Sequence, residues 1–221
     1  MNKFISEVTN EDCMEGMARY PDKYFDLAIV DPPYGIGYSD VVGKKKKEHG
    51  WKERKSSKWD LYTPPFEYFI ELFRVSKNQI IWGGNYFDLK PTRCFLIWDK
   101  VQRINQADCE LAWTSFSSSA RIFQYARGNE SGFAPKLKEI EKAFANIHPT
   151  QKPVALYKWL LSNYAKQGDK ILDTHLGSGS SRIAAYEMGF DFTDFELDTE
   201  YFEAQEKRYN AHIAQLKLEL I

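Results

Sequence analysis

The chain has 221 residues, of which 43% are hydrophobic, so it is long enough for one domain with a sizeable core and is not broadly disordered. Its net charge of −1 excludes a generally basic protein, and any polyanion would have to be bound by local patches. The cysteines Cys13, Cys94 and Cys109 form no CxxC pair, so we expect neither a disulfide framework nor a metal site. No segment resembles a signal peptide or a membrane span, which favours a cytoplasmic protein.

Predicted strands and helices alternate along the sequence. "FDLAIV" (25–30) is a continuous apolar run, typical of a strand that is covered on both faces. The segment 64–76 has proline near its start and phenylalanines at helical spacing, which predicts a helix. Similar patterns predict strands at 79–84, 94–98, 109–115, 120–126, 170–173 and 190–196. Helices are predicted at 154–165, after the glycine turn with Gly189 as its C-cap, and from 199 onward.

This alternation predicts the fold class, an α/β sandwich with a mostly parallel sheet in a single domain spanning 1–221. In such sheets, ligands bind beyond the carboxyl ends of the strands. Two sequence features fall at such ends: Asp-Pro-Pro-Tyr at 31–34, and a glycine turn in "DTHLGSGSS" at 173–181. Both are therefore candidate parts of a functional site.

The first feature, Asp31-Pro32-Pro33-Tyr34, combines an acid, two rigid residues and an aromatic ring. An exocyclic aromatic amine becomes nucleophilic when acceptors hold its two hydrogens, and the Asp31 carboxylate and the Pro32 carbonyl would provide two acceptors. The prolines restrict φ and would hold these acceptors in place, while Tyr34 offers a ring for stacking on a flipped base. The alternative is a strand terminator with an incidental turn acid.

The second feature places Gly177 and Gly179 between a predicted strand and a predicted helix. Glycines there allow a tight turn and close approach to a ligand, and the helix N-terminus offers free N–H groups to an anion. Glu196 ends the next predicted strand, where an acid can accept hydrogen bonds from ribose hydroxyls. An ordinary turn followed by a surface acid is the alternative. The third glycine of the dinucleotide motif is absent, which disfavours NAD.

A basic segment at 41–60 lies directly after the tetrapeptide and has no apolar periodicity, which predicts a mobile loop. We expect it to contact phosphates, although a solvated loop without function is the alternative. Its candidate nucleic-acid-binding residues are Lys44, Lys45, Lys46, Lys47, Trp51, Lys52, Arg54, Lys55, Lys58 and Trp59.

Four motifs in one order give the chain a specific resemblance. "DPPY" at 31–34, "HPTQKP" at 148–153, "LDTHLGSGSS" at 172–181 and "FELDTEYF" at 195–202 resemble the amino-methyltransferases of DNA. The tetrapeptide precedes the glycines, as in the permuted beta class. The related glutamine methyltransferases carry Asn-Pro-Pro-Tyr after their glycines, and so differ in both respects.

The resemblance implies a Rossmann-like methyltransferase sandwich with circularly permuted motifs that uses S-adenosylmethionine and no metal. It implies transfer of the methyl group to the 6-amino group of adenine in double-stranded DNA, by base flipping and direct in-line transfer. Asp31, Pro32, Pro33 and Tyr34 would be catalytic. The residues implied to bind the cofactor are Asp12, Cys13, His148, Thr150, Gln151, Lys152, Asp173, His175, Gly177, Gly179 and Glu196. For the "HPTQKP" residues, helix capping around a proline is the alternative.

Other implications concern the target. The small stretch 115–147 would read the DNA sequence, with Arg121, Arg127, Asn129 and Lys136 able to reach base edges. Aspartate at the head of the tetrapeptide favours adenine by resemblance, whereas methylation of the 4-amino group of cytosine and a non-catalytic nucleic-acid binder are the alternatives. We expect a monomer or a homodimer, in the context of a restriction system or a phage.

Two positions depart from the family pattern. Thr174-His175 replaces the usual Pro-Phe, and Asp194 stands where glycine is usual. Because histidine titrates near neutral pH, we expect His175 to make cofactor affinity sensitive to pH.

Overall fold

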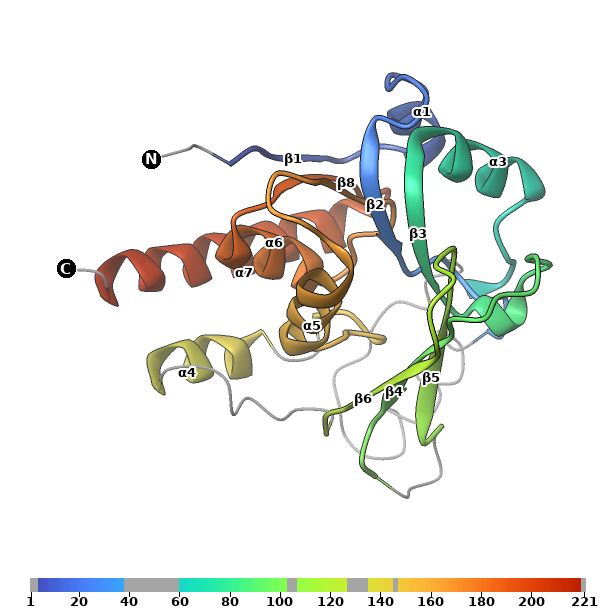
Figure 1. The fold of residues 1–221 in the computed structure, drawn as a ribbon. Helices are drawn as coiled ribbons and strands as arrows, with labels where there is room; N and C mark the ends of the chain where they lie inside the picture. The colour runs from blue at the N-terminus through green and yellow to red at the C-terminus, as the bar shows by residue number, and fades with distance from the viewer. Residues whose placement is uncertain (1–3, 38–59, 103–106, 127–134, 145–146, 220–221) are drawn as a thin grey trace.

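The computed structural model describes residues 4–37, 60–102, 107–126, 135–144 and 147–219. In this part of the chain, one eight-stranded sheet has helices on both faces (Figure 1). The strands are β1 (Ser6–Thr9), β2 (Phe25–Val30), β3 (Ser76–Trp82), β4 (Leu96–Asp99), β5 (Cys109–Thr114), β6 (Arg121–Gln124), β7 (Lys170–Asp173) and β8 (Asp191–Phe195). The helices are α1 (Cys13–Met17), α3 (Phe66–Val75), α4 (Pro135–Ala143), α5 (Val154–Tyr164), α6 (Ser180–Met188), α7 (Thr199–Glu219) and the 3-10 turn η2 (Gly84–Tyr86).

The strand order β1-β8-β7-β2-β3-β5-β4-β6 brings distant parts of the sequence together. β2 lies parallel to β7, with Leu27 opposite Ile171 and Ala28 opposite Leu172, although the two strands are far apart in sequence. From this pair the chain runs outward to β8 on one side and to β3 on the other, so a topological switch point lies between β2 and β7. The carboxyl ends of the two strands therefore meet at the edge where ligands bind in such sheets.

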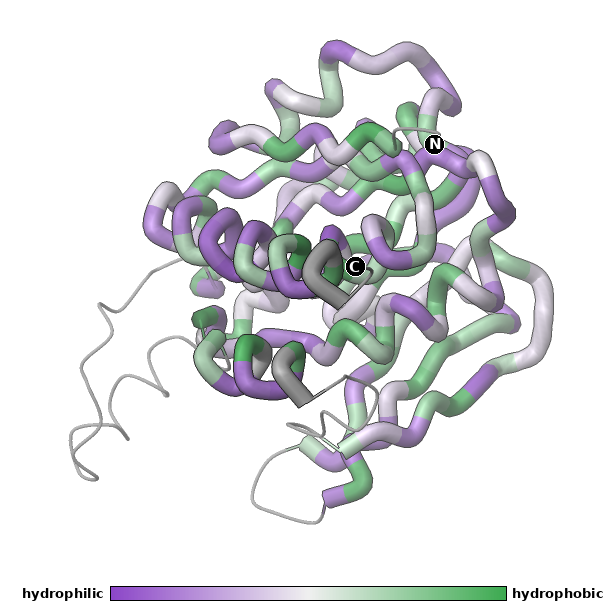
Figure 2. Tube along the Cα trace, turned by 90° about the vertical axis from the view of Figure 1, so that its left-hand side faces the viewer, coloured by the Kyte–Doolittle hydropathy of each residue, from purple (hydrophilic) through white to green (hydrophobic). Residues whose placement is uncertain are grey.

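Two helical layers cover the sheet, with α5, α6 and α7 on one face and α1 and α3 on the other (Figure 1). Alternating side chains of β2 serve both layers: Leu27 and Ile29 pack toward α5 and α6, whereas Ala28 and Val30 pack toward α1 and α3. Figure 2 shows hydrophobic segments inside the molecule and hydrophilic outer turns on α7, the helix that leads to the C-terminus. Burial on both faces explains the uninterrupted apolar run of β2.

The predicted α/β fold with a mostly parallel sheet is confirmed. β5 runs antiparallel to both of its neighbours, and the other described pairings are parallel. The sequence patterns did not predict β1, α1, α4 or η2, each of which is nine residues or shorter. Such short elements carry too few repeats for a periodic pattern to appear.

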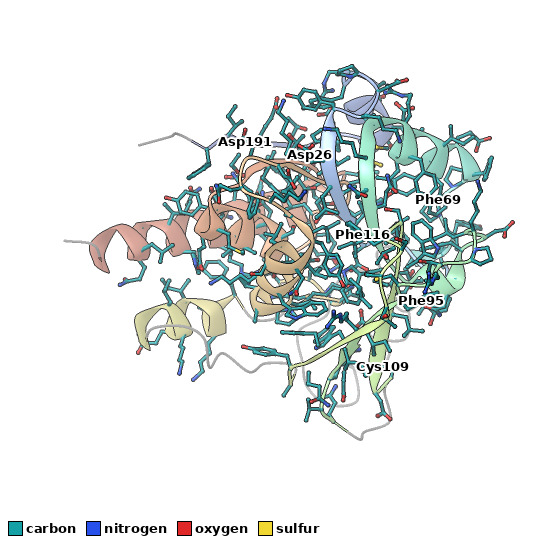
Figure 3. The ribbon with its side chains drawn as sticks, viewed as in Figure 1. Asp26, Phe69, Phe95, Cys109, Phe116 and Asp191 are labelled. Atoms are coloured by element: carbon teal, nitrogen blue, oxygen red, sulfur yellow. The ribbon has the colours of Figure 1, made fainter. Side chains whose placement is uncertain are left out.

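Acidic side chains at the amino ends of the strands have structural partners. Asp26, at the start of β2, accepts a hydrogen bond from Lys77 Nζ at 2.6 Å and one from the backbone N–H of Lys170 at 2.9 Å. Asp191, at the start of β8, accepts from the N–H of Ile5 at 2.9 Å. Figure 3 shows both acids on the amino-end side of the sheet. These hydrogen bonds hold strands together at their amino ends, whereas Asp31 lies at the carboxyl end of β2.

Several predictions fall outside the described residues. These include almost all of the predicted basic loop at 41–60, and with it its lysines, arginine and tryptophans, as well as Arg127 and Asn129 in the predicted recognition stretch. Among the helices described here, none combines the length and the apolar character that crossing a membrane requires.

Candidate active site

The turn after β2 is fixed by Asp60, which sequence reasoning missed. Asp60 is 2% exposed, and its Oδ1 accepts hydrogen bonds from the backbone N–H groups of Tyr34 and Gly35 at 2.9 and 3.1 Å. Its carbonyl accepts from the N–H of Gly37 at 2.9 Å. The two prolines end the ladder, so the N–H groups that follow need another acceptor. The two prolines in the sequence indicated that these N–H groups need an acceptor, but no sequence pattern identified Asp60 as that acceptor.

Replacing Asp60 with alanine should lower the free energy of unfolding by about 2–3 kcal/mol, because it removes the buried acceptor of two N–H groups. Asp60→Asn keeps an oxygen acceptor and should lose only about 1 kcal/mol. Urea denaturation of both variants measures the difference. Equal losses would show that Asp60 does not act through these hydrogen bonds.

Asp31 lies at the centre of the site and both of its carboxylate oxygens have partners. Oδ1 accepts a hydrogen bond from the Tyr34 hydroxyl at 2.5 Å, and Oδ2 forms an ion pair with Lys152 Nζ. We expected Lys152 among the cofactor residues; its ammonium contacts the catalytic candidate, and its role at the cofactor stays a prediction. Lys152 is 121 positions away in sequence, which is why spacing alone did not reveal this contact.

The Tyr34 ring packs in an aromatic cluster. It stacks on Tyr86 of η2, with ring centroids 5.1 Å apart and planes inclined by 14°, and meets Phe87 edge-on at 6.2 Å. Gly83 (φ +69°) makes room for it, since a Cβ at this position would overlap the Tyr34 ring. One face of Tyr34 is thus covered by Tyr86, and a base that stacks on this face would replace the Tyr86 ring.

The glycine turn lies at the end of β7, beside this cluster in the sheet order. Gly177 and Gly179 have φ of +55° and +73°, a region that favours glycine. The N–H of Gly177 donates to Glu196 Oε2 at 2.8 Å, and the N–H of Asp198 donates to Glu196 Oε1 at 2.9 Å. The structure therefore brings Glu196 directly onto the turn, and its binding of ribose hydroxyls stays a prediction.

The other face of the turn is supported by α7, which the sequence analysis assigned no role. Arg208 is 1% exposed, and its Nη1 donates to the carbonyl of Ser178 at 2.7 Å and to Ser180 Oγ at 2.9 Å. Gln205 lies 3.2 Å from the position that a Cβ on Gly179 would take, which is closer than an ordinary van der Waals contact. These two side chains fix the backbone that precedes α6.

The "HPTQKP" segment joins the two turns. His148 lies about a van der Waals distance (3.5 Å) from where a Cβ on Gly177 would stand, and its ring meets Tyr201 edge-on at 4.5 Å. Thr150 Oγ1 and His148 Nδ1 are hydrogen-bonded at 3.0 Å. His148 is thus at the glycine turn while Lys152 is at Asp31, and α5 begins directly afterwards. Gln151 Oε1 is buried without a hydrogen-bond partner among the described residues.

His175 does not have the neutral-range titration that we expected, and that prediction is wrong. Burial lowers the pKa of His175 to about 4, so the ring is uncharged at neutral pH. Nδ1 is hydrogen-bonded to Thr174 Oγ1 at 2.9 Å, and the ring meets Tyr68 edge-on at 5.5 Å. The imidazole therefore behaves here as a neutral, packed ring.

Asp12 and Cys13 form the start of α1. Asp12 Oδ1 accepts from the N–H of Met14 at 2.7 Å, which caps the helix, and its charge acts on His175. Cys13 packs against the core layer beneath α1 and α3, and burial raises the pKa of its thiol to about 12. Cys13 is therefore an uncharged, apolar contact at this end of the site.

Two buried acids lie side by side on β7 and β8. Asp173 and Asp194 are 1% and 0% exposed and are paired in register. Burial raises the pKa of Asp173 to about 7. Burial, and then the nearby Asp173, raise the pKa of Asp194 well above the usual range for a carboxyl group. Asp194 is thus a fully buried carboxyl group with a raised pKa, at the position where the family usually has glycine.

Arg121 is exposed at the start of β6, where its backbone N–H donates to the carbonyl of Phe95 at 3.0 Å. Within the described residues, no contact connects it with the turn at Asp31. The recognition stretch predicted at 115–147 includes β6 and α4, and its use in reading DNA stays a prediction.

Three comparisons bear on this site. Residues 98–207 match the family model described as DNA methylase. The chain is 26% identical to the Type II methyltransferase M2.DpnII of Streptococcus pneumoniae over 77% of this chain and 56% of that protein. It is 22% identical to the Type II methyltransferase M2.MboI of Moraxella bovis over 94% of this chain and 89% of that protein.

Solved structures share the fold across most of the chain. The PvuII DNA methyltransferase, described as cytosine-N4-specific, superposes with a TM-score of 0.60 at 13% identity, over 93% of this chain and 87% of that one. M1.HpyAVI in its SAM complex gives 0.58 at 17% identity, over 93% of this chain and 100% of that one.

The family match runs from within β4 to within α7 and includes the glycine turn and Glu196, while the tetrapeptide after β2 lies outside it. Relatives aligned over most of the chain extend the similarity to the part that holds β2. The tetrapeptide also precedes the glycine turn in the sequence. The chain therefore belongs to the amino-methyltransferases of DNA and has the motif order of their beta class.

Proposed function

We propose that the protein transfers the methyl group of S-adenosylmethionine to the 6-amino group of adenine in double-stranded DNA. One observation carries this proposal: Asp31 and the glycine turn end two adjacent parallel strands at the switch point of the sheet. A group that holds an amine and a turn that holds a methyl donor would then face the same space. Aspartate at the head of the tetrapeptide supports adenine by family resemblance.

Methylation of the 4-amino group of cytosine is the second candidate. It is supported by the fold similarity to PvuII DNA methyltransferase, which is described as cytosine-N4-specific. Both bases present an exocyclic amine with two hydrogens, so the Asp31 carboxylate and the Pro32 carbonyl would serve either one.

The described residues fit S-adenosylmethionine. N–H groups at the start of α6 would bind the carboxylate of its methionine part, and Asp173 would bind the amino group. Glu196 has one backbone N–H on each oxygen and retains acceptor capacity for ribose hydroxyls. The buried, unpaired Gln151 Oε1 can accept a hydrogen bond from a ligand.

When bound, the cofactor supplies an electrophilic methyl carbon, whose bond to sulfur breaks as the bond to the amine nitrogen forms. The role of this chain is to hold the amine. Asp31 accepts one amine hydrogen and the Pro32 carbonyl accepts the other, which raises the electron density on nitrogen. The carboxylate also receives the proton that the amine must release. Tyr34 and Asp60 hold the turn, so little reorganisation is needed during transfer.

Because the pKa of Asp173 is about 7, cofactor affinity should depend on pH through this group. The ionised carboxylate is the form that binds a cationic amino group, so affinity should fall about tenfold between pH 7 and pH 5.5 as Asp173 is protonated. Calorimetric titration across this range measures the effect.

Two variants identify the group responsible. In Asp173→Asn, affinity should be weaker and nearly constant with pH. His175→Gln should retain the pH dependence of the unmodified protein, because His175 is already neutral above about pH 4. If His175→Gln abolished the dependence, our assignment of it to Asp173 would be wrong.

Further parts of the proposal concern DNA and context. We infer that the basic segment at 41–60 binds phosphates and that 115–147 reads the target sequence, so that methylation is site-specific and proceeds by base flipping. The protein would act in the cytoplasm as a monomer or homodimer, within a restriction system or a phage.

The test is incubation of the protein with labelled S-adenosylmethionine and DNA of varied sequence, followed by digestion to nucleosides. Label in N6-methyldeoxyadenosine is the expected result, and label in N4-methyldeoxycytidine would move the assignment to the second candidate. Bound cofactor without any transfer to DNA would refute both.

A further inference from the structure

Four charged side chains form one chain of ion pairs at the catalytic turn. Lys152 Nζ contacts Asp31 Oδ2 and lies 3.1 Å from Glu110 Oε2, while Glu110 Oε1 lies 2.8 Å from Lys100 Nζ. Negative and positive groups therefore alternate in the order Asp31, Lys152, Glu110, Lys100. No sequence motif had marked Glu110 or Lys100 as a site residue.

The four residues come from separate parts of the fold. Asp31 follows β2, Lys100 follows β4, Glu110 is in β5, and Lys152 lies just before α5. β4 and β5 pair so that Trp98 lies opposite Glu110, which brings the acid and Lys100 to the same end of the hairpin. Figure 3 shows the neighbouring Cys109 at the end of the hairpin where β4 stops and β5 starts. Three chain segments thus converge on the carboxyl end of β2.

Burial strengthens the electrostatic interactions among these four groups. The side chain of Lys152 is 1% exposed and that of Lys100 is 8% exposed, so water screens neither charge well. Lys152 also lies 5.3 Å from the centre of the Trp82 ring. A buried ammonium with Asp31 as its single counter-ion would draw electron density from that carboxylate and make it a weaker acceptor. Because Glu110 contacts the same ammonium, the attraction of Lys152 is shared between two carboxylates and its effect on Asp31 is smaller.

We propose that Glu110 is a positioning residue for Asp31: by sharing the Lys152 ammonium, it orients the catalytic carboxylate and preserves its strength as an acceptor for the target amine. This inference rests on the proposed transfer to an exocyclic amine. Lys100 holds the second oxygen of Glu110 and balances its charge, so the four groups sum to zero.

The charges around Asp31 agree with this role. Burial raises the pKa of Asp31, Lys152 lowers it, and Glu110 raises it. Asp173 on β7, Tyr68 on α3 and Tyr157 on α5 also interact electrostatically with Asp31, while the Tyr34 hydroxyl donates a hydrogen bond to it. Loss of the Glu110 charge should therefore lower the pKa of Asp31, and loss of the Lys152 charge should raise it.

The test compares Glu110→Gln with Lys152→Met in DNA methylation. Glu110→Gln should reduce kcat about tenfold with an unchanged KM for cofactor, and should shift the acid limb of the kcat–pH profile to lower pH. Lys152→Met should shift that limb to higher pH. Glu110→Asp keeps the charge and should retain the profile of the unmodified protein. Glu71→Gln, which breaks an ion pair with Arg74 on α3, is the matched control and should change neither quantity.

A second readout does not depend on transfer. The carboxyl carbon of Asp31, followed by NMR in the cofactor-free protein, should titrate at lower pH in Glu110→Gln and at higher pH in Lys152→Met. Unshifted or equally shifted titrations in the two variants would overturn the proposal, as would a Glu110→Gln variant with unchanged kcat. If the unmodified protein methylates no DNA, the proposed function fails instead, while the NMR titration still tests the influence of Glu110 on Asp31.

Discussion

Replacing Asp31 with asparagine is expected to reduce the rate of methyl transfer by about 10³-fold while cofactor affinity changes little. Asparagine has nearly the same size, but it replaces one acceptor oxygen with an NH₂ donor that would oppose the amine or Lys152. Single-turnover rates with labelled cofactor measure transfer, and calorimetry measures binding.

Asp26→Asn is a matched control for this change. Asp26 lies at the amino end of β2, the strand that Asp31 follows, and is also paired with a lysine, Lys77. That variant should retain near-normal transfer. If Asp31→Asn kept more than about a tenth of the normal rate, Asp31 would not be the group that activates the amine.

The second large effect is expected at Gly83. A Cβ there would overlap the Tyr34 ring, and φ of +69° adds backbone strain. Gly83→Ala should therefore displace Tyr34 from Tyr86 and from Asp31, and lower kcat about 10²-fold. Rate measurements at saturating cofactor and DNA would detect this loss.

Gly168→Ala is the control that introduces backbone strain without displacing the Tyr34 ring. Gly168 has φ of +90° in the turn before β7, and no atom lies within 4 Å of a Cβ built there. This variant should be destabilised by about 1 kcal/mol and keep its kcat. Equal losses of kcat in the two variants would contradict the role that we give to the Tyr34 position.

The sequence predicted those elements whose residues form an apolar run, a helical spacing or a recognisable cap. β2 occupies the predicted range 25–30, α5 begins at Val154 as expected, and Gly189 ends α6 with φ of +74°. A run of six apolar residues and a left-handed C-cap are local signals, so they are visible without the fold. The reversed direction of β5 has no such signal, because periodicity does not encode strand direction.

The site likewise contains residues that the sequence could predict and residues whose contacts it could not. Asp31, Gly177 and Glu196 could be selected because each ends a strand, and parallel strands place such residues at one edge. The contacts of Lys152 and Asp60 depend on long-range packing. Only the folded chain shows that Lys152 pairs with Asp31 and that Asp60 binds the N–H groups of the turn. The neutral state of His175 likewise follows from its burial.

The most direct test of the account is a crystal structure of the protein with S-adenosylhomocysteine. Our central claim is that the turn after β2 and the turn after β7 form a single site. We predict that the methionine part lies on Gly177 and Gly179, that the ribose hydroxyls bind Glu196, and that the sulfur faces Asp31. A ligand bound elsewhere, or with its sulfur turned away from Asp31, would contradict the claim.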